Sequence, residues 1–170
     1  MKRYARISAL LLVILMLFCS CKNEKKTCEE ILVAGLEYGI DGYADSGYFY
    51  LKSADEGSAF FLTEKKMKLL YGERFFDTIS SLKDFAIYTF ATAPYEISIF
   101  ECYSSADTYD ALEACYERAD ELKVAMRFGK WEEASKGIAV AVYKKYVILA
   151  FTDSPQRSEE TVEAIISSLN

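Results

Sequence analysis

No histidine occurs among the 170 residues, so the side chains that could do chemistry are carboxylates, serines, lysines and cysteines. Histidine is the commonest general base, and without it Ser–His and Cys–His nucleophiles are excluded. Acidic residues occur as adjacent pairs, for example at 29–30, 132–133 and 159–160. Neighbours on a helix point in different directions, so none of these pairs forms an acid/base dyad by its spacing. We interpret them as solvated faces.

Two short motifs fit known chemistry only in part. Ser80 and Lys83 have the S-x-x-K spacing of penicillin-binding enzymes, but the K-T-G motif that those enzymes also need is missing from the sequence. The loop that begins at Asp41 departs from the calcium-binding EF-hand pattern at three positions, including the twelfth, which is Lys52. We therefore expect no catalytic residue, no metal and no cofactor.

The five cysteines fall into two groups. Cys28, Cys102 and Cys115 have none of the spacings of zinc or redox motifs. A buried free cysteine packs as a small hydrophobic residue, which is the simplest role for Cys102 and Cys115. A disulfide between those two is the open alternative in an exported protein. The other two cysteines, Cys19 and Cys21, belong to the N-terminal segment.

The N-terminus has the parts of an export signal. Basic residues within the first six positions precede an uninterrupted apolar run at 9–19, which is too short to span a bilayer. The run ends at Ser20-Cys21 and polar residues follow. This junction resembles a bacterial lipobox, although Phe18 occupies a position where Leu is usual. An ordinary secretory signal peptide is the alternative.

The lipobox resemblance implies cleavage after residue 20 and a diacylglyceryl group on Cys21. Residues 1–20 are then a signal peptide, 21–27 a lipid-anchored tether, and 28–170 a single globular domain on the outer face of the cytoplasmic membrane. The whole chain has a net charge of −6, and loss of the three basic residues in the signal peptide makes it −9. This charge argues against a nucleic-acid partner. It also predicts that the domain stands away from an anionic lipid surface.

Tyr48 and Tyr50 belong to a stretch rich in aromatic residues between positions 43 and 61. Exposed tyrosines can stack on sugar rings or on a peptide. Glu96 lies beside a predicted hairpin turn, and we consider these three residues candidate ligand contacts. The alternatives are core packing for the aromatic side chains and a turn-capping or cross-strand role for Glu96.

The elements that must position these residues alternate between hairpins and helices. Thr27 begins a capping box, and Thr63 offers a cap for a brief helix that ends at Gly72. The turn at Lys144-Lys145 lacks the Gly or Asn that a tight hairpin favours. Strands are predicted at 48–52, 59–62, 85–92, 96–103, 138–143 and 146–152, and helices at 28–38, 63–71, 107–128 and 156–169.

The core at 84–169 therefore consists of one ββα unit followed by another. Short connections favour antiparallel neighbours. We predict an α+β fold: an antiparallel sheet built from the two ββα units with helices packed on one face, plus an N-terminal helix and short strands. A faint internal repeat supports the two units, because Tyr95-x-Ile97-x-x-Phe100 and Tyr146-x-Ile148-x-x-Phe151 share their spacing.

Several segments are similar to one known family. They are Asp84-Phe85-Ala86-Ile87-Tyr88, Tyr95-Glu96-Ile97-Ser98-Ile99-Phe100, the long charged helix, and Lys145-Tyr146-Val147-Ile148-Leu149. From residue 82 to 166 the chain resembles a domain of unknown function found in lipoproteins of Gram-positive anaerobic bacteria. The resemblance implies an arrangement of helices and strands and a location at the membrane, and it implies no catalytic residues.

Two classes of function follow. The first is a lipid-anchored lipoprotein that acts as a non-catalytic binding or accessory module of the cell envelope, with an envelope protein or ligand as its partner. The alternative is a small carboxylate-dependent envelope enzyme that acts on glycans. Such an enzyme needs a cleft in which two carboxyl groups face each other, one of them with a raised pKa.

Overall fold

The computed structural model describes residues 25–40, 47–90, 95–127 and 131–170. The predicted signal peptide, Cys21 and the loop at 41–46 lie outside the described residues. Within the described part of the chain, no helix is both long enough and apolar enough to cross a membrane.

The helices are α2 (Cys28–Gly39), α3 (Glu64–Tyr71), α4 (Phe76–Ser81), α5 (Thr108–Met126), α6 (Glu132–Ser135) and α7 (Pro155–Ser168), and short 3-10 turns, η2 (Glu73–Phe75) and η3 (Ser105–Asp107), precede α4 and α5. The strands are β1 (Tyr48–Leu51), β2 (Asp84–Thr89), β3 (Glu96–Glu101), β4 (Ala139–Tyr143) and β5 (Tyr146–Phe151). The two hairpins, β2–β3 and β4–β5, are each followed by a helix, as the hydrophobic pattern predicts. Thr27 and Thr63 cap α2 and α3 as predicted.

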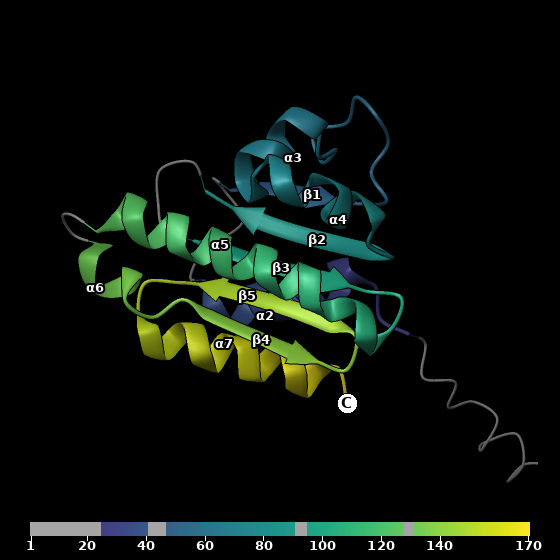
Figure 1. The fold of residues 1–170 in the computed structure, drawn as a ribbon. Coiled ribbons are helices and arrows are strands. Elements are labelled where there is room, and N and C mark those ends of the chain that lie inside the picture. The colour runs from purple at the N-terminus through teal and green to yellow at the C-terminus, as the bar shows by residue number, and fades with distance from the viewer. Residues whose placement is uncertain (1–24, 41–46, 91–94, 128–130) are drawn as a thin grey trace, which may run out of the picture.

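The strands form one five-stranded sheet in the order β1-β2-β3-β5-β4 (Figure 1). Every neighbouring pair is antiparallel, and the two hairpins meet through β3 and β5, where Ile99 lies opposite Ile148. The predicted α+β class and the antiparallel sheet are therefore confirmed.

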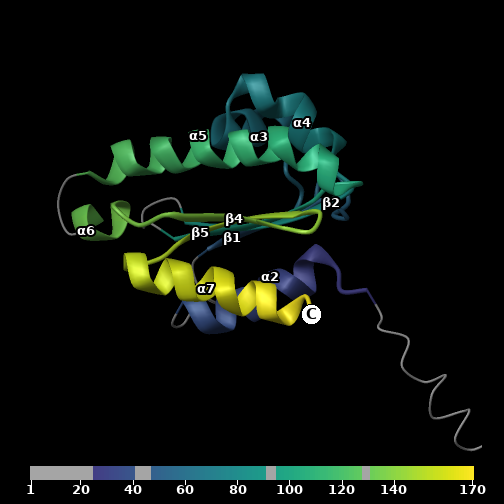
Figure 2. The ribbon, with the colours of Figure 1, turned by 60° about the horizontal axis from the view of Figure 1, so that its bottom comes forward.

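Helices cover both faces of the sheet, so the prediction that they pack on one face is wrong. Figure 2 shows α3, α4 and α5 on one side of the strands and α2 with α7 on the other. The reason is that β3 and β5 are buried along their whole length and carry apolar side chains on both faces. A strand with two apolar faces needs cover on each of them.

The internal repeat is a property of the strands alone. Ile97 and Ile148 both point into the core beneath α2 and α7, whereas Phe100 and Phe151 both point towards α5. The helices that follow the two hairpins nevertheless pack on opposite faces, as α5 and α7 do in Figure 2. The two hairpins therefore have matching strands, but the helices that follow them lie on opposite faces of the sheet.

Other differences from the predicted elements are local. Residues 59–62 form no strand, and Phe61 makes only an isolated bridge to Leu51. The short helices α4 and α6 were absent from the predicted elements, because four to six residues carry too little periodicity. The β4–β5 hairpin does have a two-residue turn, and Lys144 adopts a φ of 54° to make it.

Candidate functional site

Two of the three predicted ligand contacts lie inside the protein. Tyr48, on the edge strand β1, is 53% exposed, but Tyr50 packs in the core under α3 and α5. Glu96 is only 1% exposed. Burial removes Tyr50 and Glu96 from solvent, so we no longer expect either to contact a ligand. Tyr48 is exposed, but it lines neither of the two pockets described below.

Glu96 belongs to a buried hydrogen-bond network that joins the sheet to two helices. Arg118 of α5 donates from Nε and Nη2 to Oε2 of Glu96, at 3.0 and 2.7 Å. The Tyr71 hydroxyl donates to Oε1 at 3.2 Å, and the Thr89 hydroxyl donates to Oε2 at the same distance. Burial alone would lower the pKa of Arg118, but the Glu96 carboxylate outweighs it and raises that pKa. The network therefore holds the Arg118 guanidinium against the Glu96 carboxylate as a buried ion pair.

Glu101 lies at the opposite end of β3 and is 3% exposed. Three lysines bring their ammonium groups to its Oε1 atom: Lys83 at 3.0 Å, Lys145 at 2.6 Å, and Lys25. Burial would raise the pKa of Glu101, and the hydrogen bonds from Lys145, Lys25 and Lys83 outweigh it and lower that pKa to about 2. This carboxylate stays ionised at any physiological pH.

Cys28, Asp84 and Glu101 place potential metal-ligand atoms within 4.8 Å of one another. A metal would have to displace ammonium groups from Glu101. It would also have to ionise the Cys28 thiol, whose pKa is raised by burial and by the neighbouring Asp84 carboxylate. The donor atoms therefore do not suit a divalent cation.

The cysteines of the described chain are free and buried. Cys102 and Cys115 do not pair, so the simpler prediction of core packing describes them. Burial raises the pKa of the Cys102 thiol to about 11 and also raises that of Cys115. These thiols are poor nucleophiles at neutral pH.

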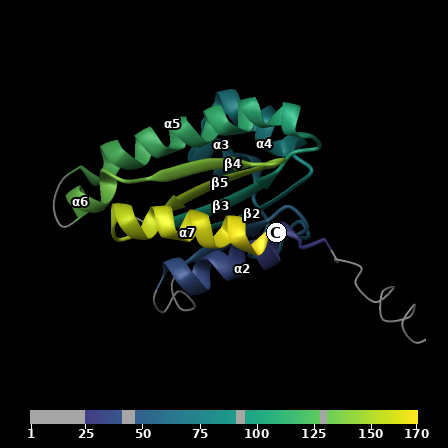
Figure 3. The same cartoon turned by 90° about the horizontal axis from the view of Figure 1, so that it is seen from below.

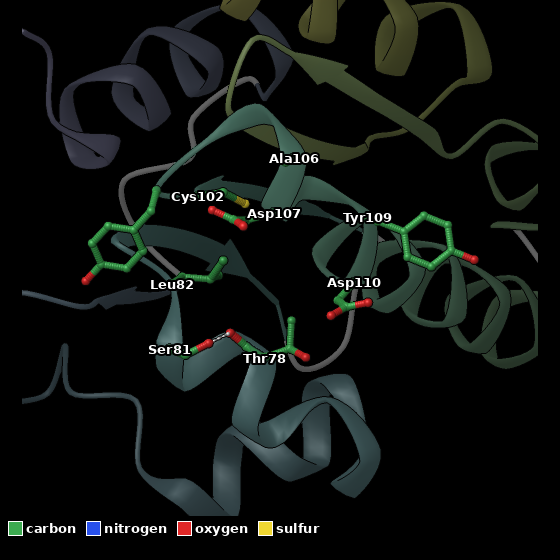
Figure 4. Close-up of a pocket in the computed structure, with 9 residues that line it drawn as sticks. Thr78, Ser81, Leu82, Cys102, Ala106, Asp107, Tyr109 and Asp110 are labelled. Carbon is green, nitrogen blue, oxygen red and sulfur yellow. Dashed lines mark hydrogen bonds between the residues drawn. The ribbon is translucent and has the colours of Figure 1, made fainter.

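A pocket of about 550 Å³ lies where α4, the end of β3 and the start of α5 meet (Figure 4). Thr78 and Ser81 of α4 form one wall, and Asp107 and Asp110 at the start of α5 form the other. The Asp107 carboxylate accepts hydrogen bonds from the backbone N–H and hydroxyl of Ser104, at 2.9 and 2.8 Å. Asp107 thus serves mainly as a cap, and Asp110 is the carboxylate left facing the hydroxyl groups of α4.

Two tyrosines that line this pocket are largely exposed, Tyr103 at 70% and Tyr109 at 71%. The sequence predictions missed both. Tyr109 could have been identified from the sequence, because it lies on the polar side of the amphipathic α5 helix. A large aromatic ring at such a position is not buried in the core, so its exposure is a signal of another role. Tyr103 lies two residues after the end of β3 and carries no comparable sequence signal.

Neither a protein-family model, nor a curated protein, nor a solved structure matches this chain. The resemblance to lipoproteins of Gram-positive anaerobic bacteria therefore stays a prediction.

Proposed function

We propose that this protein is a lipoprotein, anchored through Cys21 on the outer face of the cytoplasmic membrane, whose folded domain binds an envelope ligand or protein without catalysing a reaction. The observation that carries the binding role is the pocket between α4 and α5, whose lining residues include the largely exposed Tyr103 and Tyr109. The Tyr109 ring lies at the rim of the pocket and is turned outward (Figure 4). The anchor rests on the sequence of the N-terminal segment.

The pocket favours a ligand with both a flat apolar face and polar groups. Tyrosine rings offer stacking surfaces at low cost in side-chain entropy. Asp110 and the Thr78 hydroxyl supply hydrogen-bonding groups on the two walls. The Ser81 hydroxyl donates to the Thr78 carbonyl at 2.9 Å and can only accept from a ligand. Sugar rings and peptides that carry an amine fit that description.

The buried carboxylates argue against the alternative of a glycan-cleaving enzyme. A general acid needs a raised pKa so that it holds a proton at neutral pH. The pKa of Glu101 moves the other way, to about 2, and Glu96 is bound by the Arg118 guanidinium. In the pocket itself, Asp107 is occupied as a cap for the turn before α5.

The anchor is tested with Cys21→Ser in the producing cell. Without the thiol that accepts the diacylglyceryl group, the protein should appear in the medium or accumulate as an unprocessed precursor. Fractionation and the mass of the product measure this. A Cys21→Ser protein of mature size that still fractionates with membranes would contradict the proposal.

The binding role is tested by photocrosslinking on intact membranes. A photoreactive phenylalanine analogue replaces Tyr109, and the matched control places the same analogue at Tyr116, which is also exposed on α5 but outside the pocket. We expect a discrete adduct from position 109 and none from position 116. Equal adducts at both positions, or none at 109, would show that the pocket is not the binding site.

A further inference from the structure

Four lysines line a second pocket, of about 400 Å³, at one end of the sheet. Lys25 and Lys26 precede α2, whereas Lys144 and Lys145 form the turn between β4 and β5. Tyr146 at the start of β5 and residues 168–170 at the end of α7 complete the pocket. Figures 1 and 3 show the start of α2, the β4–β5 turn and the C-terminal end of α7 at the same end of the molecule. We call this site the lysine pocket.

The lysine pocket presents ammonium groups to solvent and keeps its carboxylate beneath them. Lys26 donates to the Ser168 carbonyl at 2.6 Å, and the Lys144 ammonium lies 4.7 Å from the centre of the Tyr143 ring. Both lysines are exposed. Glu101 lies underneath, almost fully buried, with three ammonium groups on a single oxygen. Four lysines and no acidic side chain line the pocket, so the pocket itself is cationic. The exposed Glu29 and Glu30 lie outside this lining, in the first turn of α2.

The lysine pocket also begins immediately after the proposed anchor. Lys25 follows Cys21 by four residues, which span at most about 14 Å when fully extended. Lys25 is itself bound to Glu101, and Lys26 to the end of α7. The predicted tether at 21–27 thus includes residues that already contact the domain. A lipid on Cys21 would keep this end of the domain near the bilayer.

We propose that the lysine pocket binds phosphate groups of anionic lipids and holds this end of the domain on the membrane surface. The inference rests on the proposed lipid anchor. It reverses the expectation, drawn from the net charge of −9, that the domain stands away from such a surface. Charges further from the surface than the Debye length, about 8 Å at physiological salt, are largely screened. The local lysines therefore decide the orientation, and the acidic residues of the distal part do not.

The test measures lysine acetylation by mass spectrometry on the lipidated protein, purified with its anchor and inserted into vesicles. Vesicles of phosphatidylcholine alone are compared with vesicles that also contain phosphatidylglycerol. We expect Lys26, Lys144 and Lys145 each to react about fivefold more slowly in the anionic vesicles, the effect of one lysine near a charged surface. Lys65 and Lys123, on α3 and α5, should react equally in both.

A matched pair of variants separates local charge from total charge. Lys26→Glu with Lys144→Glu should abolish the protection of Lys145 by anionic vesicles. Lys65→Glu with Lys123→Glu changes the net charge equally and should leave that protection intact. Both pairs replace surface side chains, so circular dichroism should show the same fold for each.

The outcomes that overturn the inference are distinct from those that overturn the anchor. Equal acetylation in both kinds of vesicle, on protein that floats with both, refutes the inference alone. Inorganic phosphate added to neutral vesicles could slow lysine acetylation as much as anionic vesicles do. That result would show that the pocket binds free phosphate and not the bilayer. Protein that fails to float with neutral vesicles refutes the proposed anchor and, with it, the orientation that depends on it.

Discussion

Glu96 and Glu101 are both buried carboxylates on β3, and their side chains leave the strand on opposite faces. Glu96 meets one guanidinium inside the core, and Glu101 meets three ammonium groups near the surface. A buried charge is tolerated only when its partners and hydrogen bonds replace the lost water. The two carboxylates have different cationic partners, so the stability of the domain should depend on each of them in a different way.

Glu101 should make the stability of the domain depend on acid pH. Its pKa in the folded state, about 2, lies below the ordinary glutamate value of about 4.3. The stabilisation is therefore present above about pH 5 and is lost as the pH falls towards 2. Since the three lysines are partly exposed, we expect it to amount to about 1–3 kcal/mol.

Urea unfolding of the native protein and of Glu101→Gln between pH 7 and pH 2 measures this contribution. The free energy of unfolding should differ between the two proteins at neutral pH, and the difference should shrink across the acid range. A difference that stays constant down to pH 2 would mean that the lysines do not hold the carboxylate ionised.

Arg118→Met should destabilise the domain by about 3–5 kcal/mol, because it leaves the Glu96 carboxylate buried without its cation. Combining it with Glu96→Leu should recover much of that loss, since an apolar pair of similar volume needs no charge compensation. Chemical denaturation of the single and double variants gives the coupling free energy. Additive effects would show that the two side chains do not act as a pair.

At the scale of elements, α2 and α7 approach each other closely beneath the sheet (Figure 3). A Cβ on Gly39 would lie 2.6 Å from Oγ1 of Thr161, and a Cβ on Gly35 would lie 2.8 Å from Cδ1 of Ile165. Both glycines are buried within α2. They allow the first and last helices of the described chain to cover one face of the sheet together.

Gly39→Ala should therefore destabilise the domain by about 1–3 kcal/mol, although alanine is the better helix former. Thr161 is β-branched and fully buried, so it cannot move aside easily. Adding Thr161→Ala removes the clash and should restore part of the stability. Thermal unfolding of the three variants measures both effects, and a neutral Gly39→Ala would mean that α2 and α7 can separate without cost.

At the scale of the whole molecule, two apolar layers on either side of the sheet hold the fold together. One lies between the sheet and α3, α4 and α5, and the other lies between the sheet and α2 and α7. The cysteines of the described chain are free, and the one metal-like cluster found there is occupied by lysines. Apolar burial on both faces of the sheet is the main source of stability in this arrangement.

The melting temperature should therefore be the same with and without EDTA, and with and without a thiol reductant. The buried thiols of the processed protein should react with a disulfide reagent at pH 8 only after denaturation, since burial raises their pKa values. A melting temperature that falls by several degrees in EDTA would show a structural metal. Rapid reaction of a native thiol would show that one of them is accessible.

The sequence by itself determined the local elements. The capping box at Thr27, the apolar stripe of α5 and the alternation of short strands depend on residues close together in the chain. They were enough to predict an α+β class and antiparallel hairpins. The turn at Lys144 shows the limit of such rules, because the pairing of β4 with β5 holds a lysine at positive φ where glycine or asparagine was expected.

Only the tertiary structure decided which face each helix covers and which charges meet. The apolar run of β5 requires cover on both faces, but it does not say that α5 takes one and α7 the other. Glu96 is buried because Arg118, far away in the sequence, forms an ion pair with it. Glu101 forms ion pairs with lysines from three separate segments of the chain. These contacts join residues far apart in the chain, and their energies depend on burial, which local spacing does not contain.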